Sequence, residues 1–285
     1  MVLIVLAGAL LFFYKNNIAT QKSGAQNEPQ NQPAAFSVLD EKDYTALTGM
    51  ETYEVKSAEF KVYAPKNTLT APGYFEVYQS GTKVFASDPD YLISGLLSFV
   101  FGDTTYVVVK DYSGGAHCCD TDYLFRVNPA GQVKLIKTFD IGNVTISKDS
   151  LLLKNNKLYL VLIDDRFQYF HTAYVDSYFF NQYLRLDGDA VYAANQDFAE
   201  IIAKTAQDCR AKIAHDASDA WLNDFLCYAA NYTLIGKQNT ALEDFNGFFN
   251  QFFPSGSGKD SFGETIQRDT LKQEIIETLQ HDRFN

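Results

Sequence analysis

The chain has 285 residues, and its 35 acidic and 24 basic residues give a net charge of −11. Hydrophobic residues make up 46% of positions and charged residues 21%, which is a globular composition and excludes disorder of the whole chain. The negative charge argues against nucleic acid as a partner, because phosphate backbones are bound by clustered Lys and Arg. The 23 Phe and 18 Tyr residues favour β-sheets.

An apolar segment opens the chain. Residues 2–14 (VLIVLAGALLFFY) contain no polar side chain except the final tyrosine. The segment is shorter than the about 20 residues of a membrane-spanning helix and is typical of the hydrophobic region of a signal peptide. We expect residues 1–14 to be an export signal or a membrane anchor; a buried core segment is the alternative. Residues 15–35 are rich in Asn, Gln, Ala and Pro, so residues 15–50 are predicted to be a flexible linker and lead-in.

Alternating apolar and polar residues predict a β-sheet domain over residues 51–195. Gly-containing turns of hairpin length join several of the expected strands. These strands are Glu59–Tyr63, Tyr74–Tyr78, Lys83–Ala86, Leu97–Phe101, Tyr106–Lys110, Thr121–Val127, Val133–Phe139, Lys157–Ile163, Tyr174–Phe180, Tyr183–Leu186 and Ala190–Ala193.

The β region contains an internal repeat. A shift of 50 positions aligns Phe75–Val77 with Phe125–Val127, and each is followed by a glycine four positions on. A shift of 54 positions aligns Asp111 with Asp165, and each is followed by a histidine six positions on. Units of about 50 residues with four strands are typical of propeller blades. Only two or three copies fit, so we expect an antiparallel, blade-like meander; chance similarity of aromatic strands is the alternative.

The most distinctive motif is Ser113-Gly114-Gly115-Ala116-His117-Cys118-Cys119. It resembles a GGAHCC loop that recurs in uncharacterised exported bacterial proteins, where it follows a strand of a propeller-like, FG-GAP-like sheet. The resemblance covers residues 103–138. It implies a β-rich extracytoplasmic domain, in the periplasm or at the cell surface, and it implies no activity.

The motif admits several chemical interpretations. A zinc site would draw its ligands from Asp111, His117, Cys118, Cys119, Asp120, Asp122 and His171. Adjacent residues of a strand point to opposite faces, so one ion could take only one of the two cysteines. A Cys–His nucleophile and a redox-active vicinal disulfide are further alternatives. The favoured prediction is a structural loop with no catalytic residue and no cofactor.

Residues 196–285 have helical periodicity and predict a small α-helical domain. The cysteines Cys209 and Cys227 lie in two helical segments on either side of a turn at residues 215–219. Antiparallel helices would bring them within disulfide range, so we predict this pair; two separate buried thiols are the alternative. The expected helices are Asp197–Ala214, Asp219–Ile235, Asn239–Phe253 and Phe262–Arg283.

The second and third of these helices resemble a single tetratricopeptide-type hairpin. The residues that carry the resemblance are Tyr232, Gly236, Ala241 and Phe245. A lone hairpin of this kind packs on its own domain more often than it binds peptides.

The sequence therefore predicts a β-rich α+β fold in an exported, membrane-tethered bacterial envelope protein. The expected role is non-catalytic binding or scaffolding, with a protein or a cell-wall component as partner and the membrane contacted through the N-terminal segment. A small envelope enzyme or metal-binding protein that uses the loop of His117, Cys118 and Cys119 is the alternative.

Overall fold

In the part of the chain that the structure describes, most strands belong to three antiparallel meanders of four consecutive strands. The computed structural model describes residues 34–64, 72–89, 92–114, 120–142, 144–215, 220–281 and residue 284. The first sheet contains β2 (Gly49–Val55), β3 (Ala58–Ala64), β4 (Tyr74–Gln79) and β5 (Thr82–Ala86). The second contains β6 (Leu92–Phe101), β7 (Thr104–Tyr112), β8 (Asp120–Val127) and β9 (Val133–Gly142), with β1 (Phe36–Asp43) added beside β6. The third contains β10 (Leu151–Lys154), β11 (Lys157–Phe167), β12 (Tyr178–Asp187) and β13 (Ala190–Ala193).

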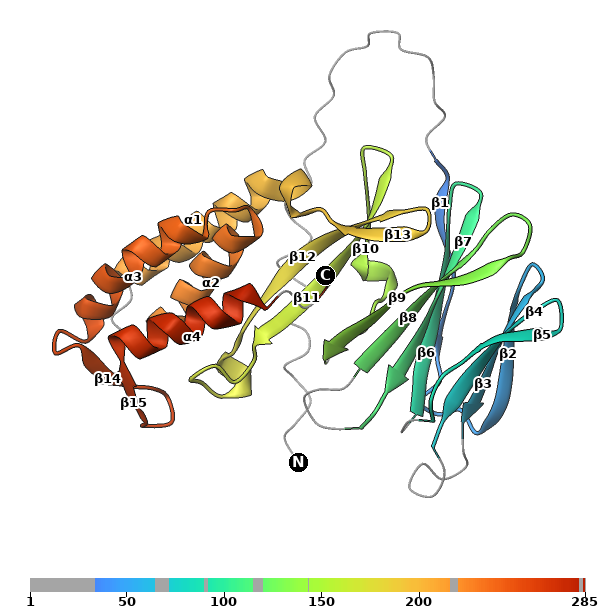
Figure 1. Cartoon of the computed structure of the whole chain (residues 1–285), viewed down its shortest axis with the longest axis horizontal. Helices are drawn as coiled ribbons and strands as arrows, with labels where there is room; N and C mark the ends of the chain where they lie inside the picture. The colour runs from blue at the N-terminus through green and yellow to red at the C-terminus, as the bar shows by residue number, and fades with distance from the viewer. Residues whose placement is uncertain are drawn as a thin grey trace, which may run out of the picture. The chain divides into compact units, whose positions relative to one another are not determined.

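Helices follow the third sheet. They are α1 (Ala199–His215), α2 (Trp221–Leu234), α3 (Gln238–Phe252) and α4 (Arg268–Gln280), and a short hairpin of β14 (Ser257–Lys259) and β15 (Thr265–Gln267) separates α3 from α4. Short 3₁₀ turns occur at Lys148–Ser150, Tyr174–Asp176 and Asn195–Phe198. The helices lie against the third sheet (Figure 1).

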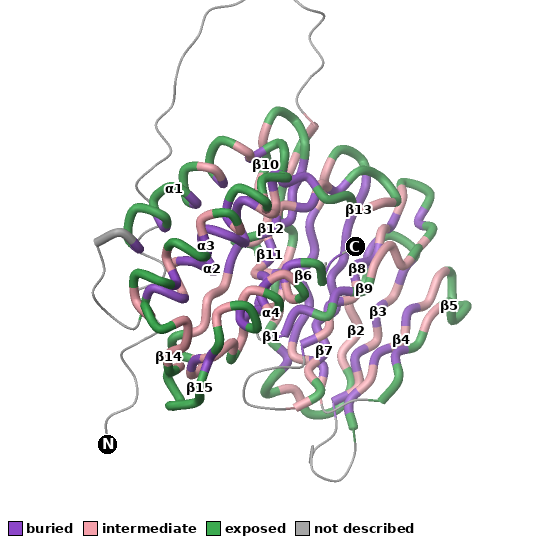
Figure 2. The backbone as a smooth tube through the Cα atoms, turned by 60° about the vertical axis from the view of Figure 1, so that its left-hand side comes forward, coloured by how far each residue is buried: buried purple, intermediate pink, exposed green. Residues whose placement is uncertain are grey.

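Three hydrophobic cores hold these layers together. Phe60 and Phe75 of the first sheet pack with Val107 of the second. On the opposite face of the second sheet, Val108 packs in a core with Leu160 of the third. The other face of the third sheet forms one core with the helices (Figure 2). The second sheet is therefore covered on both faces, which explains why β7 is almost entirely buried instead of alternating between buried and exposed residues.

Local sequence explains the burial pattern of β3, the close approach of β1 to β6, and the point at which α2 ends. In β3 every second residue is buried, as a strand covered mainly on one face requires. A Cβ atom at Gly95 of β6 would lie 2.6 Å from the carbonyl oxygen of Lys42, so a residue without a side chain lets β1 approach. Gly236 has a φ of 76° and ends α2, where the N–H of Lys237 returns to the carbonyl of Tyr232 at 2.7 Å.

The predicted α+β class, with antiparallel sheets and a C-terminal helical region, is confirmed. Each of the two sequence shifts aligns strands that hold the same position in consecutive meanders. Phe75 and Phe125 lie in the third strands of the first two meanders. Likewise, Asp111 and Asp165 lie in the second strands of the second and third meanders.

Several element predictions were wrong. Strands β1, β2, β10, β14 and β15 were not predicted, and β1 lies within the stretch expected to be a lead-in. The expected strands Tyr174–Phe180 and Tyr183–Leu186 are one strand, β12, preceded by a 3₁₀ turn. The last helix begins at Arg268 instead of Phe262. The reason is a turn around Asp260, whose Oδ1 accepts hydrogen bonds from the backbone N–H groups of Phe262 and Glu264, both at 2.9 Å.

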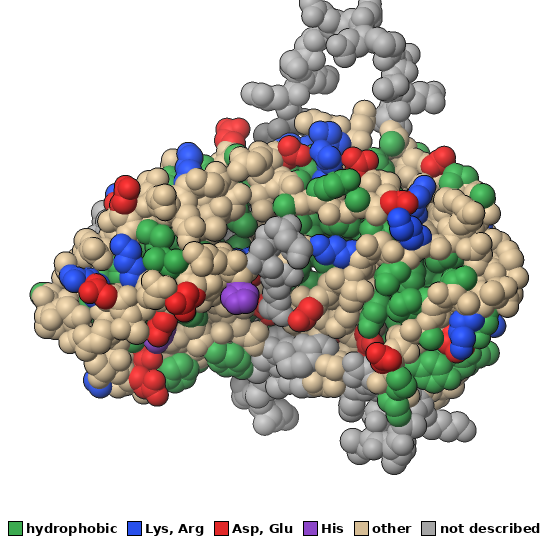
Figure 3. All heavy atoms as spheres, viewed as in Figure 1, with side chains coloured by type: hydrophobic (Ala, Val, Ile, Leu, Met, Phe, Trp, Pro, Cys, Tyr) green, Lys and Arg blue, Asp and Glu red, His purple; other side chains and the backbone are tan. Residues whose placement is uncertain are grey.

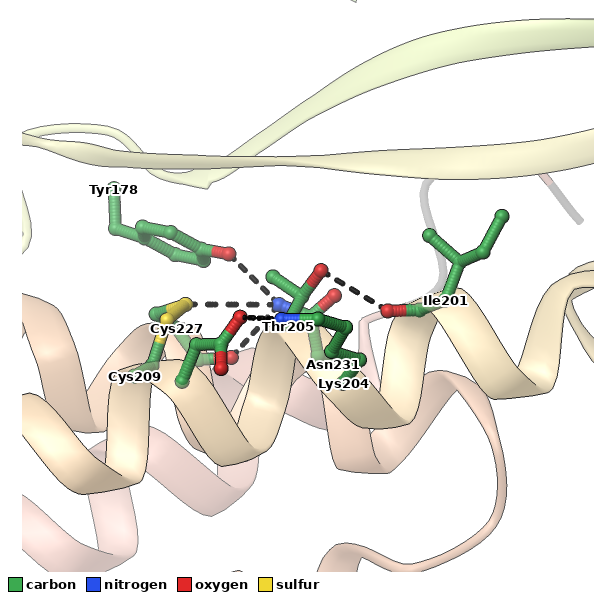
Figure 4. The surroundings of a disulfide bond; sticks show 8 residues. Tyr178, Ile201, Lys204, Thr205, Cys209, Cys227 and Asn231 are labelled. Carbon is green, nitrogen blue, oxygen red and sulfur yellow. Dashed lines mark hydrogen bonds and ion pairs between the residues drawn. A yellow bond between two sulfur atoms is a disulfide. The ribbon is translucent and has the colours of Figure 1, made fainter. Parts of the chain in front are cut away.

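Cys209 of α1 and Cys227 of α2 lie at disulfide distance, as the sequence predicts, with Cα atoms 6.0 Å apart. Figure 4 shows the amide of Asn231 beside this pair. Its nitrogen donates to the carbonyl of Cys227 and to the hydroxyl of Tyr178 on β12, both at 2.8 Å. The pair is thus tied to the third sheet through one buried amide.

None of the helices within the described ranges is long and apolar enough to cross a membrane. The predicted signal or anchor at residues 1–14 lies outside these ranges.

Candidate functional site

The predicted loop site is only partly described. His117, Cys118 and Cys119 fall in residues 115–119, outside the described residues. Asp111 is buried near the end of β7, and His171 lies in the loop after β11. Both side-chain partners of His171 come from the C-terminal region, and neither of them is Asp111. Across the described ranges, no group of three or more His, Cys, Asp or Glu side chains is arranged to hold a metal ion.

A cavity of about 940 Å³ surrounds the exposed side of His171. It lies among the ends of β9 and β11, the loop after β11, the turn between β14 and β15, and α4. Figure 3 shows acidic side chains gathered beside a histidine over α4 and the β14–β15 hairpin. The lining residues are Asp140, Arg166, Tyr169, Phe170, His171, Asp260, Phe262, Glu264, Glu274, Glu277, Thr278 and His281.

Arg166 forms the fixed base of this cavity. Its guanidinium donates to both carboxylate oxygens of Asp164, with Nε 3.0 Å from Oδ1 and Nη2 2.6 Å from Oδ2, and Asp164 is fully buried. Nη1 donates to the carbonyl oxygen of Leu279 at 3.0 Å and so holds the last turn of α4. The positive charge of Arg166 is therefore matched by Asp164 before any ligand arrives.

His171 joins the loop after β11 to the C-terminal segment. Nδ1 lies 3.2 Å from Oδ2 of Asp260, and Nε2 lies 2.8 Å from Oε2 of Glu274. Ionised carboxylates only accept hydrogen bonds, so both contacts are hydrogen bonds when each ring nitrogen carries a proton. The backbone has a φ of 53°, an unusual conformation for a residue with a side chain. It is held by the hydroxyl of Ser261, which donates to the His171 carbonyl at 2.9 Å.

Asp260 is the buried partner in this arrangement, with 2% of its side chain exposed. Burial opposes its ionisation most strongly. Hydrogen bonds from the Glu264 N–H, from His171 and from the Phe262 N–H outweigh burial and lower the pKa of the carboxyl. Asp260 is thus an ionised anchor for both the turn and the histidine.

The remaining lining is acidic and aromatic. Glu264 and Glu277 are exposed on the cavity wall, and Glu274 is 42% exposed. Tyr169 and Phe262 are 47% and 59% exposed at the same cavity. Carboxylates attract cations, and aromatic faces add cation–π attraction. The cavity is therefore suited to a positively charged group.

A smaller cavity of about 290 Å³ shares His171 and Asp260 with the first. Its apolar part consists of Trp221, Leu222, Phe253 and Ile266, and its polar part adds Thr172, Asn223, Lys259 and Ser261. The His171–Asp260 pair thus borders both the acidic cavity and a smaller cavity whose lining is mainly polar.

Two further carboxyls named among the possible zinc ligands lie on β8. Asp122 is fully buried; its Oδ2 accepts the N–H of Ile146 at 2.5 Å, and Oδ1 has no hydrogen-bond partner within the described part of the chain. Burial raises the pKa of Asp122 to about 8 and that of Asp120 to about 6. Lys110 lies opposite Asp122 in the register and pairs with Glu41 at 3.3 Å. These groups line no described cavity and bear on stability.

Sequence reasoning singled out His171 and missed its partners. Glu274, Glu277 and His281 lie at positions i, i+3 and i+7 of α4 and its end, a spacing that places them on one helix face and could have been noticed. No comparable signal marks Asp260.

No protein-family model matches the chain, and no curated protein or solved structure matches it either.

Proposed function

We propose that this protein is an exported, membrane-tethered binding protein of the bacterial envelope and that the cavity beside His171 binds a cationic ligand. The observation that carries the proposal is a cavity of about 940 Å³ lined by five carboxylates, with aromatic rings exposed at its edge. The ligand is a protein segment or a cell-wall component that bears ammonium or guanidinium groups.

Charge supports a cationic ligand. Asp140, Asp260, Glu264, Glu274 and Glu277 face the cavity from three separate parts of the chain. The charge of Arg166 is matched by Asp164, and a doubly protonated His171 would offset only one of its two carboxylate partners, so the carboxylates still outnumber the cationic groups of the lining. A concave acidic wall concentrates field lines and raises the local concentration of cations, and the net charge of −11 adds to this attraction.

The state of His171 supports binding without catalysis. Each ring nitrogen lies within hydrogen-bond distance of a carboxylate, so a substrate would have to displace Asp260 or Glu274 to reach one. The Thr278 hydroxyl in the lining donates to the carbonyl of Glu274 at 2.8 Å, one turn back in the same helix. The side chains of His171 and Thr278 are therefore arranged for binding a charged ligand and not for proton transfer.

The envelope location is supported by residues 2–14, the polar stretch that follows, and the Cys209–Cys227 pair. Disulfides persist in oxidising compartments outside the cytoplasm. We infer that the sheets are propeller-like blades, because the sequence repeat aligns strands that hold the same position in consecutive meanders.

Calorimetry with spermidine and trilysine tests the ligand class. We expect saturable binding at low salt that weakens as salt is added, because exposed charges are screened. A Glu264→Gln/Glu277→Gln variant is expected to bind about tenfold more weakly, a loss of about 1.4 kcal/mol. The control variant Glu243→Gln removes an exposed charge on α3, away from the cavity, and is expected to bind as the unaltered protein does. Absence of saturable binding, or an equal loss in the control, would contradict the proposal.

Cell fractionation tests the location. We expect the full chain in the membrane or periplasmic fraction of an expressing bacterium. Recovery of a soluble cytoplasmic protein that retains residues 2–14 would contradict it.

A further inference from the structure

We infer that a cationic ligand displaces His171 from Glu274, and that its binding therefore releases a proton from Nε2 of the His171 ring. The proton passes to solvent and not to the ligand, whose covalent bonds do not change. This inference rests on the proposed function and adds the regulation of the same cavity. Affinity for a cation rises with pH through the range in which histidine loses its charge.

Asp260 holds the other ring nitrogen whether or not a ligand is bound. Its Oδ2 lies 3.2 Å from Nδ1 of His171, and its side chain is only 2% exposed. Its Oδ1 accepts the backbone N–H groups of Phe262 and Glu264, both at 2.9 Å, so this carboxylate is fixed in place. A neutral imidazole carries a single N–H, and the buried carboxylate keeps it on Nδ1, because an ionised carboxylate only accepts hydrogen bonds. Nε2 is therefore the nitrogen that loses its proton.

Glu274 is the partner that changes. Its Oε2 lies 2.8 Å from Nε2 of His171, and 42% of its side chain is exposed. When Nε2 has lost its proton, its lone pair faces the carboxylate and the contact is no longer a hydrogen bond. Glu274 also lines the acidic cavity, where an ammonium or guanidinium group gives it a charge-assisted hydrogen bond instead. The ligand and the Nε2 proton thus compete for one carboxylate.

The other carboxylates of the cavity supply an attraction that does not vary with pH in this range. They are Asp140 of β9, Glu264 of the turn between β14 and β15, and Glu277 of α4, and all three are exposed. Exposed carboxyls are ionised above about pH 5. The change in affinity between about pH 5 and 8 therefore comes from histidine.

The remaining titratable or charged groups beside His171, among the described residues, are Arg166 of β11, Tyr169 of the same loop, Lys259 of β14 and His281 after α4. Arginine, lysine and tyrosine do not change charge between about pH 5 and 8, whereas histidine does. The ring of His281 makes no hydrogen bond or ion pair within the described part of the chain, so it holds no carboxylate that a ligand could take. His281 is therefore the matched control for His171.

Calorimetry on the full chain with Ac-Arg-Arg-Arg-NH₂ and with spermidine tests the exchange, because both probes keep their charge at about pH 6.5. Titrations in PIPES and in ACES, two buffers of different ionisation enthalpy, count the protons released per bound probe. We expect about half a proton or more at about pH 6.5, and affinity for the peptide at least about fivefold higher at pH 8 than at pH 5.5. Binding without proton release would overturn the inference and leave the proposed function intact. Binding of neither probe would overturn both.

Three variants assign the proton to the contact between His171 and Glu274. His171→Asn and Glu274→Gln are each expected to remove most of the proton release while the peptide still binds at pH 8, which also reports that the protein is folded. His281→Asn is expected to keep most of the proton release. Release that persists in folded His171→Asn or in Glu274→Gln, or that is lost in His281→Asn alone, would overturn the inference. Glu274→Gln changes a partly exposed side chain of α4, so it decides the question even where His171→Asn does not fold.

Discussion

Nε2 of His171 lies 2.8 Å from Oε2 of Glu274, across 103 positions of the sequence. The contact fastens the loop after β11 to α4 and closes one side of the acidic cavity. Replacing His171 by Asn tests how strongly it fastens them, because Asn tolerates the left-handed backbone at this position. We expect the free energy of unfolding to fall by about 1 kcal/mol, since the ring is 22% exposed and water partly replaces its partners.

Urea unfolding of His171→Asn, Glu274→Gln and the double variant measures this coupling. We expect the double variant to lose less than the sum of the two single losses, because each single change breaks the same contact. Additive losses would show that the two side chains act independently.

The buried carboxyls of β8 predict that stability falls as the pH rises. Burial raises the pKa of Asp122 from 3.8 to about 8 and that of Asp120 to about 6. Below pH 3.8 both carboxyls are protonated in the folded and unfolded states, and their contribution is fully present. Between pH 3.8 and about 8 the folded state holds protons that the unfolded state has released, so stability is progressively lost as the pH rises through this window.

Asp122→Asn isolates this effect, because Asn keeps an oxygen for the Ile146 N–H and does not titrate. We expect the variant to be more stable than the unaltered protein at pH 8, by a few kcal/mol, and less pH-dependent between pH 5 and 8. Urea midpoints across this range measure the difference. The control Asp149→Asn, an exposed site in the turn before β10, is expected to leave the pH profile unchanged. An equal pH slope in Asp122→Asn would contradict the assignment.

The cysteine pair predicts a redox-dependent stability. Cys209 and Cys227 are 18 positions apart, and the chain-entropy treatment gives a contribution of about 3 kcal/mol for a loop of this length. We expect Cys209→Ser/Cys227→Ser to unfold at lower urea than the oxidised protein. A reductant is expected to shift the unaltered protein toward the variant and to leave the variant where it is. Peptide mapping without reduction provides the direct check, and free thiols at both positions would refute the pairing.

How much of the fold the sequence predicts depends on how far apart in the chain the interacting residues lie. The alternation in residues 58–64 and the apolar run in β7 are local, and both strands were predicted. β1 and β2 carry charged residues at several positions and become strands through pairing with β6 and β3, so their own pattern does not reveal them. The Cys209–Cys227 pair was predictable because antiparallel helices fix the geometry across a short turn.

The candidate site was far less predictable. His171 was singled out, yet its partners lie 89 and 103 positions further on, and no spacing rule relates a loop to a helix over such distances. Asp260 lies between Lys259 and Ser261, in the stretch that separates the expected helices Asn239–Phe253 and Phe262–Arg283. In the folded chain that segment contains β14 and a turn organised by the Asp260 carboxylate. Its structure therefore depends on packing that the local composition does not show.

Near the C-terminus, Phe284 inserts between the second and third sheets. It is 2% exposed, its ring centroid lies 6.4 Å from that of Phe139, and its carbonyl accepts a hydrogen bond from Lys137. We expect Phe284→Ala to lower the free energy of unfolding by about 3 kcal/mol, because truncating a buried phenylalanine removes hydrophobic contacts and leaves a cavity. Urea unfolding measures the change, and Phe262→Ala is the matched control. Phe262 is 59% exposed, so its truncation is expected to change stability by less than about 0.5 kcal/mol. Equal effects of the two truncations would show that Phe284 does not hold the sheets together.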